Sequence, residues 1–132
     1  MRRCRIYDKV LKIIRDVKYI DFENEEVMFY ADDYKEDGYY PNLDIVRSFN
    51  EVNIMWSTGM KDKNGVDIYE GDICQFLIGS YKTRLGIRWS YSTLKWIGDC
   101  EQESFNLSDF SSKGIEVIGN IYEDQARKVI SR

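Results

Sequence analysis

A chain of 132 residues with a net charge of −4 has room for one domain or two very small ones, because a polypeptide this short buries only about two-thirds of its unfolded surface. Ten Tyr, six Phe, three Trp and a single Pro indicate half-buried strands rather than disorder. No apolar stretch has the length of a membrane span or of a signal-peptide core, so we expect a cytoplasmic protein with no membrane partner.

The first 56 residues are predicted to form a β-hairpin region. Strand-forming residues flank the polar turn at 23–26, and this arrangement is typical of a hairpin. The elements that we expect here are strands at 5–8, 10–14, 17–22 and 27–30, a loop at 32–42, and a short helical turn over Leu43–Phe49 with Asn42 as its cap.

Charge is segregated within this first region. Residues 1–18 contain seven basic residues and two acidic ones, whereas residues 19–56 contain ten acidic residues and two basic ones. A basic strip is compatible with nucleic-acid binding. The acidic segment directly after it favours a different interpretation, in which the two segments pair within the fold or across a subunit interface.

Residues 57–132 open on two turn signals. Asn64–Gly65 predicts the tip of a tight hairpin, because Asn-Gly is favoured where two successive residues need a positive φ. Tyr69–Asp72 predicts a second turn, in which Gly71 supplies the permissive backbone. That turn leads into a strand at Ile73–Ile78, with Cys74 and Phe76 on one face.

The strand at Lys82–Ser90 has the clearest alternation in the chain. Its apolar face carries Leu85, Ile87 and Trp89, and its other face is basic. Further strands are predicted at Thr93–Ile97, with Leu94 and Trp96 on one face, and at Ile115–Tyr122, with Ile115, Val117 and Ile121 aligned; a capped turn at Ser108–Phe110 precedes the last strand. Five short strands with one helical turn before the last are typical of an SH3-like barrel. We therefore expect an all-β protein with little helix, in which an N-terminal hairpin region (residues 1–56) and a barrel region (residues 57–132) form one compact molecule without a long linker.

Three ordered blocks of this sequence resemble the YopX family of small phage and prophage proteins. The blocks are Ser57–Ile73, Gly86–Trp89 and Ile115–Glu123, and the positions that carry the likeness are Gly59, Asp62, Asn64, Gly65, Tyr69, Glu70, Gly71, Asp72, Trp89, Gly119, Asn120, Tyr122 and Glu123. The resemblance implies an SH3-type barrel encoded by a phage or prophage and acting in the cytoplasm of the bacterial host. It implies no molecular activity. The start of the chain departs from the family, since Tyr7 stands where members commonly have Trp.

Catalytic chemistry has few candidate residues. The chain has no histidine, which removes the commonest general base and the usual zinc and nucleophilic pairs. Cys4, Cys74 and Cys100 are widely spaced and odd in number, as expected for structural thiols in a reducing compartment. We therefore expect no enzyme activity, no catalytic residue, no metal and no cofactor.

Two acidic clusters are explained more simply as turns than as a metal site or a catalytic pair. Asp62–Asp67 lacks the ligand spacing of a calcium loop, because Gly65 occupies its fourth position and strands rather than helices flank it. Glu70 and Asp72 have the composition of a carboxylate pair, but turn chemistry explains both.

A basic and aromatic face remains as a candidate binding surface. Its members are Tyr81, Lys82, Arg84, Arg88, Tyr91 and Trp96. Cations attract phosphate and rings stack on bases, so this composition suits single-stranded nucleic acid. The net negative charge weakens that hypothesis. The favoured hypothesis is a non-enzymatic module that self-associates or binds a host or phage protein, and the alternative is a nucleic-acid-binding regulator.

Overall fold

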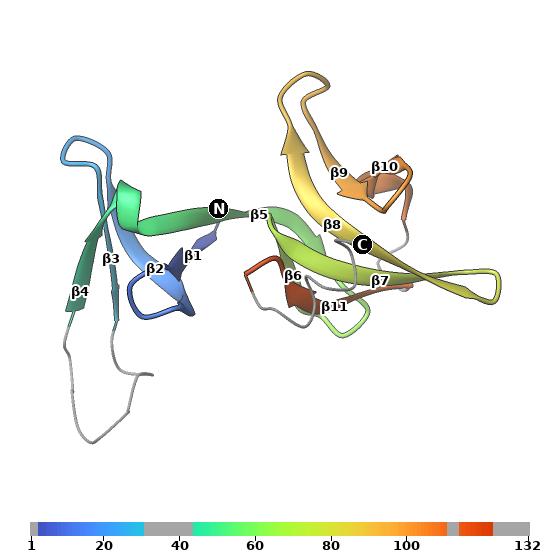
Figure 1. The fold of residues 1–132 in the computed structure, drawn as a ribbon, viewed down its shortest axis with the longest axis horizontal. Coiled ribbons are helices and arrows are strands. Elements are labelled where there is room, and N and C mark those ends of the chain that lie inside the picture. Colours follow the sequence, from blue (N-terminus) through green and yellow to red (C-terminus); the bar gives the residue numbers. More distant parts are fainter. Residues whose placement is uncertain (1–2, 31–43, 111–113, 123–132) are drawn as a thin grey trace. The chain divides into compact units, whose positions relative to one another are not determined.

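The structure is a computed structural model that describes residues 3–30, 44–110 and 114–122. These residues form eleven β-strands and two short 3₁₀ helices, so the predicted all-β class is confirmed. The chain divides into two compact units, Arg3–Met55 and Trp56–Arg132 (Figure 1). Within the described ranges, no helix combines the length and the apolar character that a bilayer span requires.

The N-terminal unit is an antiparallel meander. Its strands are β1 (Cys4–Asp8), β2 (Ile13–Asp21), β3 (Glu26–Tyr30), β4 (Asp44–Ser48) and the beginning of β5 (Val52–Lys61), in the sheet order β4-β3-β2-β1-β5. The predicted hairpin around 23–26 is confirmed as β2–β3. Ile6, Val27, Phe29 and Val52 form the buried core. Lys18 of the basic segment pairs with Asp44 of the acidic one at 3.1 Å.

Asp8 is the buried charge of the N-terminal unit. Its carboxylate accepts a hydrogen bond from Arg47 Nε at 2.9 Å and from the backbone N–H groups of Val10 and Leu11 at 3.3 and 3.2 Å. A buried carboxylate is tolerated only when it is paired and hydrogen-bonded in this way. The same bonds curl residues 9–12 into a turn, so the strand predicted at 10–14 begins only at Ile13.

The helical turn predicted over Leu43–Phe49 is wrong for the residues that the structure describes. Asp44–Ser48 is strand β4, paired along its whole length with β3. The helical turn comes later, at Phe49–Glu51, where the Ser48 N–H donates to the Glu51 carboxylate at 3.0 Å. Sheet pairing has overridden local preference here. The predicted loop at 32–42 and the cap at Asn42 lie outside the described residues.

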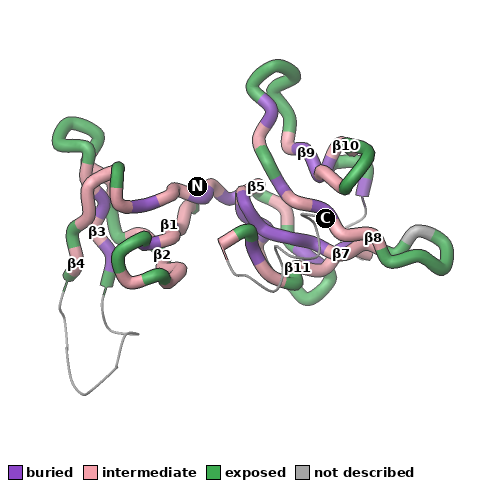
Figure 2. Tube along the Cα trace, in the orientation of Figure 1, coloured by how far each residue is buried: buried purple, intermediate pink, exposed green. Residues whose placement is uncertain are grey.

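The C-terminal unit is built around one five-stranded antiparallel sheet, consistent with a small barrel-like fold. The five strands of this sheet are β7 (Asp72–Ile78), β8 (Tyr81–Ser90), β9 (Lys95–Asp99), β10 (Ser104–Asn106) and β11 (Ile115–Asn120), in the order β10-β9-β8-β7-β11. The unit also contains the remainder of β5, which pairs with β6 (Asp67–Tyr69). The buried core consists of Ile68, Cys74, Leu85, Ile87, Leu107, Phe110 and Ile115. Figure 2 shows burial at the beginning of β7 and in the middle of β8, and exposure at the β7–β8 hairpin tip.

Asp62 joins the β5–β6 hairpin to the last strand. The Asp62 carboxylate is buried and accepts three backbone hydrogen bonds, from Asn64 at 2.8 Å, Val66 at 2.9 Å and Val117 at 3.0 Å. Burial acts to raise the pKa of Asp62, but these hydrogen bonds outweigh it and hold the pKa below its ordinary value. The residue is a structural turn residue, in agreement with the interpretation that rejected a calcium loop.

The hairpin tip differs in detail from the prediction. Asp62 N–H donates to the Val66 carbonyl at 2.8 Å, and Gly65 N–H donates to the Asp62 carbonyl at 3.0 Å. The loop therefore has three residues, and within it Gly65 has a positive φ, of 78°, whereas Asn64 does not. The prediction that both residues need a positive φ is wrong, because the Asp62 carboxylate stabilises a longer loop.

Two other predicted strands have different limits. Thr93 and Leu94 belong to the β8–β9 turn, and Leu94, with a φ of 57°, is exposed rather than aligned with Trp96. β11 ends at Asn120 and its register shifts between Val117 and Gly119, so Ile121 lies in a turn. A bulge breaks the simple alternation on which the prediction relied. The predicted turn at Ser108–Phe110 overlaps the 3₁₀ helix Leu107–Asp109.

Replacement of Asp62 tests its structural role. Asp62→Ala leaves three backbone N–H groups without their acceptor, and we expect it to lower the free energy of unfolding by about 2–4 kcal/mol. Urea denaturation measures this, and Glu101→Ala, at an exposed position, is the control with a change below about 0.5 kcal/mol.

Because the native pKa of Asp62 is lowered, its charge stabilises the fold above about pH 4 and loses this effect as the pH falls through the native pKa. Asp62→Asn should therefore lose less stability than the wild type between about pH 7 and about pH 2.5; an equal loss would contradict the assignment.

Candidate functional site

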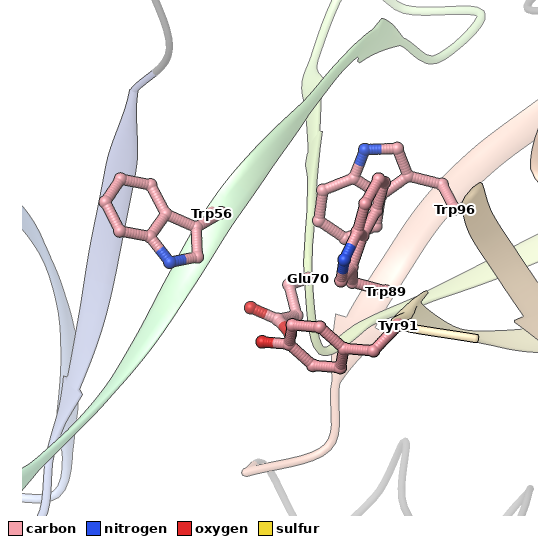
Figure 3. Close-up of a pocket in the computed structure, with 5 residues that line it drawn as sticks. All are labelled: Trp56, Glu70, Trp89, Tyr91 and Trp96. Carbon is pink, nitrogen blue, oxygen red and sulfur yellow. The ribbon is translucent and has the colours of Figure 1, made fainter. Parts of the chain in front are cut away.

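A pocket in the C-terminal unit combines four aromatic rings with one carboxylate. It encloses about 270 Å³ and is lined by Trp56, Glu70, Trp89, Tyr91 and Trp96 (Figure 3). The five residues come from β5, the β6–β7 turn, β8, the β8–β9 turn and β9, respectively. The three tryptophans of the whole sequence are therefore all in this pocket.

Backbone hydrogen bonds fix Glu70 in the pocket. The Glu70 N–H donates to the Trp56 carbonyl at 2.8 Å, and the neighbouring Gly71 N–H donates to the Ile87 carbonyl at 2.8 Å. Gly71 has a φ of 86°, which a side chain would oppose, so glycine is needed for this turn. Asp72 is buried and accepts the Tyr69 N–H at 2.8 Å, which closes the turn. The hydrogen bonds that fix the turn thus involve the backbone of Glu70 and its neighbours, and they do not use the Glu70 side chain.

Trp89 and Trp96 form one wall of the pocket. They lie opposite each other in the β8–β9 register, and their rings meet edge to face with centroids 5.1 Å apart and an interplanar angle of 66°. We expected Trp89 to lie in the core with Leu85 and Ile87. Leu85 and Ile87 are buried, whereas Trp89 is half-buried. The apolar face of β8 therefore extends beyond the core and provides the wall of the pocket.

Tyr91 and Trp56 complete the pocket. Tyr91 is 83% exposed at the β8–β9 turn, where the Leu94 N–H donates to the Ser90 carbonyl at 2.8 Å. In Figure 3, the Glu70 carboxylate and the Tyr91 hydroxyl both point toward Trp56. The pocket consequently presents ring surfaces and acceptor oxygens to whatever enters it.

The electrostatic character of the pocket is negative. Within the described ranges, no Lys or Arg forms an ion pair with the Glu70 carboxylate. The pKa of the nearby Tyr122 hydroxyl is raised by burial and, in addition, by the charge of Glu70. A carboxylate that is not neutralised and lies among rings favours a cationic ligand.

The structure separates the predicted basic and aromatic face into two groups. Tyr91 and Trp96 line the pocket, whereas Lys82, Arg84 and Arg88 lie on the other face of β8. Arg88 Nε donates to the Asp99 carboxylate, and Arg84 is half-buried. Tyr81 and Lys82 are exposed beside the β7–β8 turn. The six residues are therefore not a single surface.

The remaining positions of the family resemblance are structural wherever the structure describes them. Gly59 has a positive φ, Tyr69 and Asn120 are buried, Gly119 is at the β11 register shift, and the Asn120 side-chain oxygen accepts the Tyr122 N–H at 3.0 Å. Glu123 lies outside the described residues. Glu70 and Trp89 differ from this group because their side chains line the pocket.

The environments of Cys74 and Cys4 do not activate their thiols. Burial raises the pKa of Cys74, and the charges of Asp72 and Asp62 raise it further. Burial also raises the pKa of Cys4, with a contribution from Asp16. Nucleophilic and redox cysteines instead have a lowered pKa and an accessible sulfur. Among the described residues, no group of three or more Cys, Asp or Glu side chains is arranged to hold a metal ion.

Thiol labelling tests the environment of Cys74. We expect the native Cys74 thiol to react with an aromatic disulfide reagent at least about 100-fold more slowly than the same thiol in urea, because reaction requires the core to open. The double variant Cys4→Ser, Cys100→Ser isolates its signal. Reaction of native Cys74 at the rate found in urea would show that the sulfur is accessible and would contradict this assignment.

Sequence reasoning missed the pocket because its members are far apart in the chain. Trp56 precedes the recognised block, Glu70 had a sufficient explanation as a turn residue, and Trp89 matched the core pattern. The signal that was available was composition, since three tryptophans in a short chain that already has enough aliphatic core residues suggest a surface use.

Comparisons with known proteins agree with the observed fold. The YopX protein family model matches residues 3–127. No curated protein matches the chain. Among solved structures, the crystal structure of protein EF1440 from Enterococcus faecalis is similar with a TM-score of 0.59 and 23% sequence identity, over 95% of this chain and 96% of that chain. At this identity, the likeness shows a shared fold.

Proposed function

The chain belongs to the YopX family, and from this premise we propose that it is a non-enzymatic accessory protein, encoded by a phage or prophage, that binds a partner protein in the bacterial cytoplasm. The observation that carries the proposal is the pocket of Trp56, Glu70, Trp89, Tyr91 and Trp96, which remains open beside a complete hydrophobic core. Exposed or half-exposed tryptophan and tyrosine side chains are typical of protein-binding surfaces.

The position of the pocket supports binding rather than catalysis. Beside the Glu70 carboxylate, the described lining offers only the Tyr91 hydroxyl as a further proton donor or acceptor, and it contains no Lys, Cys or second carboxylate. Its rings are instead arranged to give contact area on a rigid support, because Trp89 and Trp96 project from paired strands. Rigid aromatic side chains lose little conformational entropy on binding.

A matched pair of tyrosine variants tests this function. Tyr91 and Tyr81 are both exposed, at 83% and 78%, but Tyr81 does not line the pocket. In affinity capture from nuclease-treated host lysate, we expect wild type and Tyr81→Ser to retain one partner protein and Tyr91→Ser to lose at least about 80% of it, as for an interface side chain worth about 1 kcal/mol or more.

The same experiment defines what would contradict the proposal. Capture of no protein by a chain that is also monomeric, or equal capture by all three forms, removes the proposed use of the pocket. Light scattering of the pure protein identifies the case in which the partner is a second copy of this chain, and the Tyr91→Ser variant should then shift the equilibrium toward the monomer.

Nucleic-acid binding is the alternative function. The exposed pair Tyr81 and Lys82 favours it, because a ring beside a cation suits a stacked base and its phosphate. The ion pair of Arg88 with Asp99 and the net charge of −4 disfavour it.

Oligonucleotide titration distinguishes the two functions. If the protein-binding proposal holds, labelled single- and double-stranded oligonucleotides should show no saturable binding at about 50 mM or about 200 mM salt. Binding that weakens between these two concentrations and is reduced in Lys82→Ala would instead support the nucleic-acid function.

A further inference from the structure

The pocket is small enough to be filled by one side chain. Its volume of about 270 Å³ is at the lower end of the roughly 300–1,000 Å³ that is typical of pockets for drug-sized ligands. Its lining comes from five separate elements, so the cavity is a product of the tertiary fold and not of one flexible loop. A single side chain of a partner protein fits these dimensions.

The chemistry of the lining selects the charge of that side chain. An aromatic ring has a negative electrostatic potential over its face, and indole is the strongest such acceptor of a cation. Among the residues that the structure describes, the lining consists of three Trp, one Tyr and Glu70, and it contains no Lys or Arg. An anionic side chain would be repelled by Glu70, and an aliphatic one would leave the carboxylate without a partner.

The backbone of Glu70 is held in place at the pocket. The backbone N–H groups of Glu70 and of Gly71 are bonded to the Trp56 and Ile87 carbonyls, respectively, so the base of the Glu70 side chain is fixed between two walls of the pocket. Within the described ranges, no cationic side chain is paired with this carboxylate, although Asp8, Asp44, Asp67, Asp99 and Glu116 each have such a partner. Glu70 is therefore available for a cation supplied from outside the chain.

We infer that this pocket binds the cationic side chain, arginine or lysine, of a partner protein, with the cation against the Trp89 and Tyr91 rings and in an ion pair with Glu70. The inference rests on the proposed protein-binding function and adds the chemical class of the residue that the partner must present. A guanidinium ion suits the site well, because its planar group stacks on rings and donates two hydrogen bonds to one carboxylate.

Intrinsic fluorescence gives a direct readout of this pocket, since it contains all three tryptophans of the chain. The probes are the N-acetyl amides of arginine and lysine, and the control ligand is the N-acetyl amide of citrulline, which has nearly the shape of arginine without the charge. We expect a saturable change in tryptophan emission with arginine or lysine amide, with a Kd on the order of millimolar, as for one isolated side chain. Citrulline amide should cause no saturable change.

Two variants locate the cation. Glu70→Gln keeps the shape of the side chain and removes its charge, and we expect it to weaken binding by about tenfold or more. Glu101→Gln makes the same chemical change at an exposed position outside the pocket and should bind like the wild type. Circular dichroism and urea denaturation of both variants show that each is folded, so a loss of binding is assigned to the site.

The outcomes separate this inference from the function on which it rests. Equal responses to arginine and citrulline amides, or equal affinities of wild type and Glu70→Gln, overturn the cation site even if a partner protein is captured. Saturable, Glu70-dependent cation binding supports the site. If that binding is found while the protein is monomeric and captures no partner protein from lysate, the protein-binding function is overturned and the chemistry of the pocket stands.

Discussion

The turn at Glu70–Gly71 is the constraint on which the C-terminal unit depends. Its backbone is bonded to Trp56 on β5 and to Ile87 on β8, and the Gly71 carbonyl accepts the Ile121 N–H at 2.8 Å, just after β11. Three segments distant in sequence therefore meet at two consecutive residues. Since Gly71 has a positive φ, the connection requires glycine at that position. The pocket forms beside this junction, because the junction fixes where Glu70 lies relative to Trp56 and Trp89.

Two buried carboxylates also fix backbone segments by hydrogen bonds, at the ends of the hairpins. Asp62 accepts backbone N–H groups from its own loop and from β11, and Asp72 accepts one from Tyr69. In the N-terminal unit, Asp8 has a similar role, with Arg47 as its cationic partner. Short hairpins have little core of their own, and a carboxylate that satisfies several N–H groups compensates for this. Glu70 differs from all three, because its side chain lines a pocket of aromatic rings.

Membership of the YopX family is informative about the scaffold. The positions that carry the resemblance are mainly turn glycines, buried aspartates and strand ends, and these determine backbone geometry. Their structural roles explain why they identify the fold without revealing an activity. The side chains that line the pocket project from this scaffold. Glu70 and Trp89 are both positions of the family resemblance and pocket residues: Glu70 is in the turn at Glu70–Gly71, and Trp89 continues the apolar face of β8.

The amino-acid sequence by itself determined the all-β class, the β2–β3 hairpin, the turn at Gly71 and the alternation of β8, because each depends on local periodicity or on the preference of glycine for one backbone conformation. The tertiary structure decided the register. A two-residue loop at Asn64–Gly65 would have set a different β5–β6 register, but the loop has three residues and the register shifts between Ser57 and Lys61, so Trp56 lies beside Glu70. Loop length and bulges depend on contacts such as Val117 to Asp62, which join residues far apart in the chain. The lack of histidine could be read from composition. The aromatic pocket around one carboxylate depends on the shifts in strand register, so only the tertiary structure showed it.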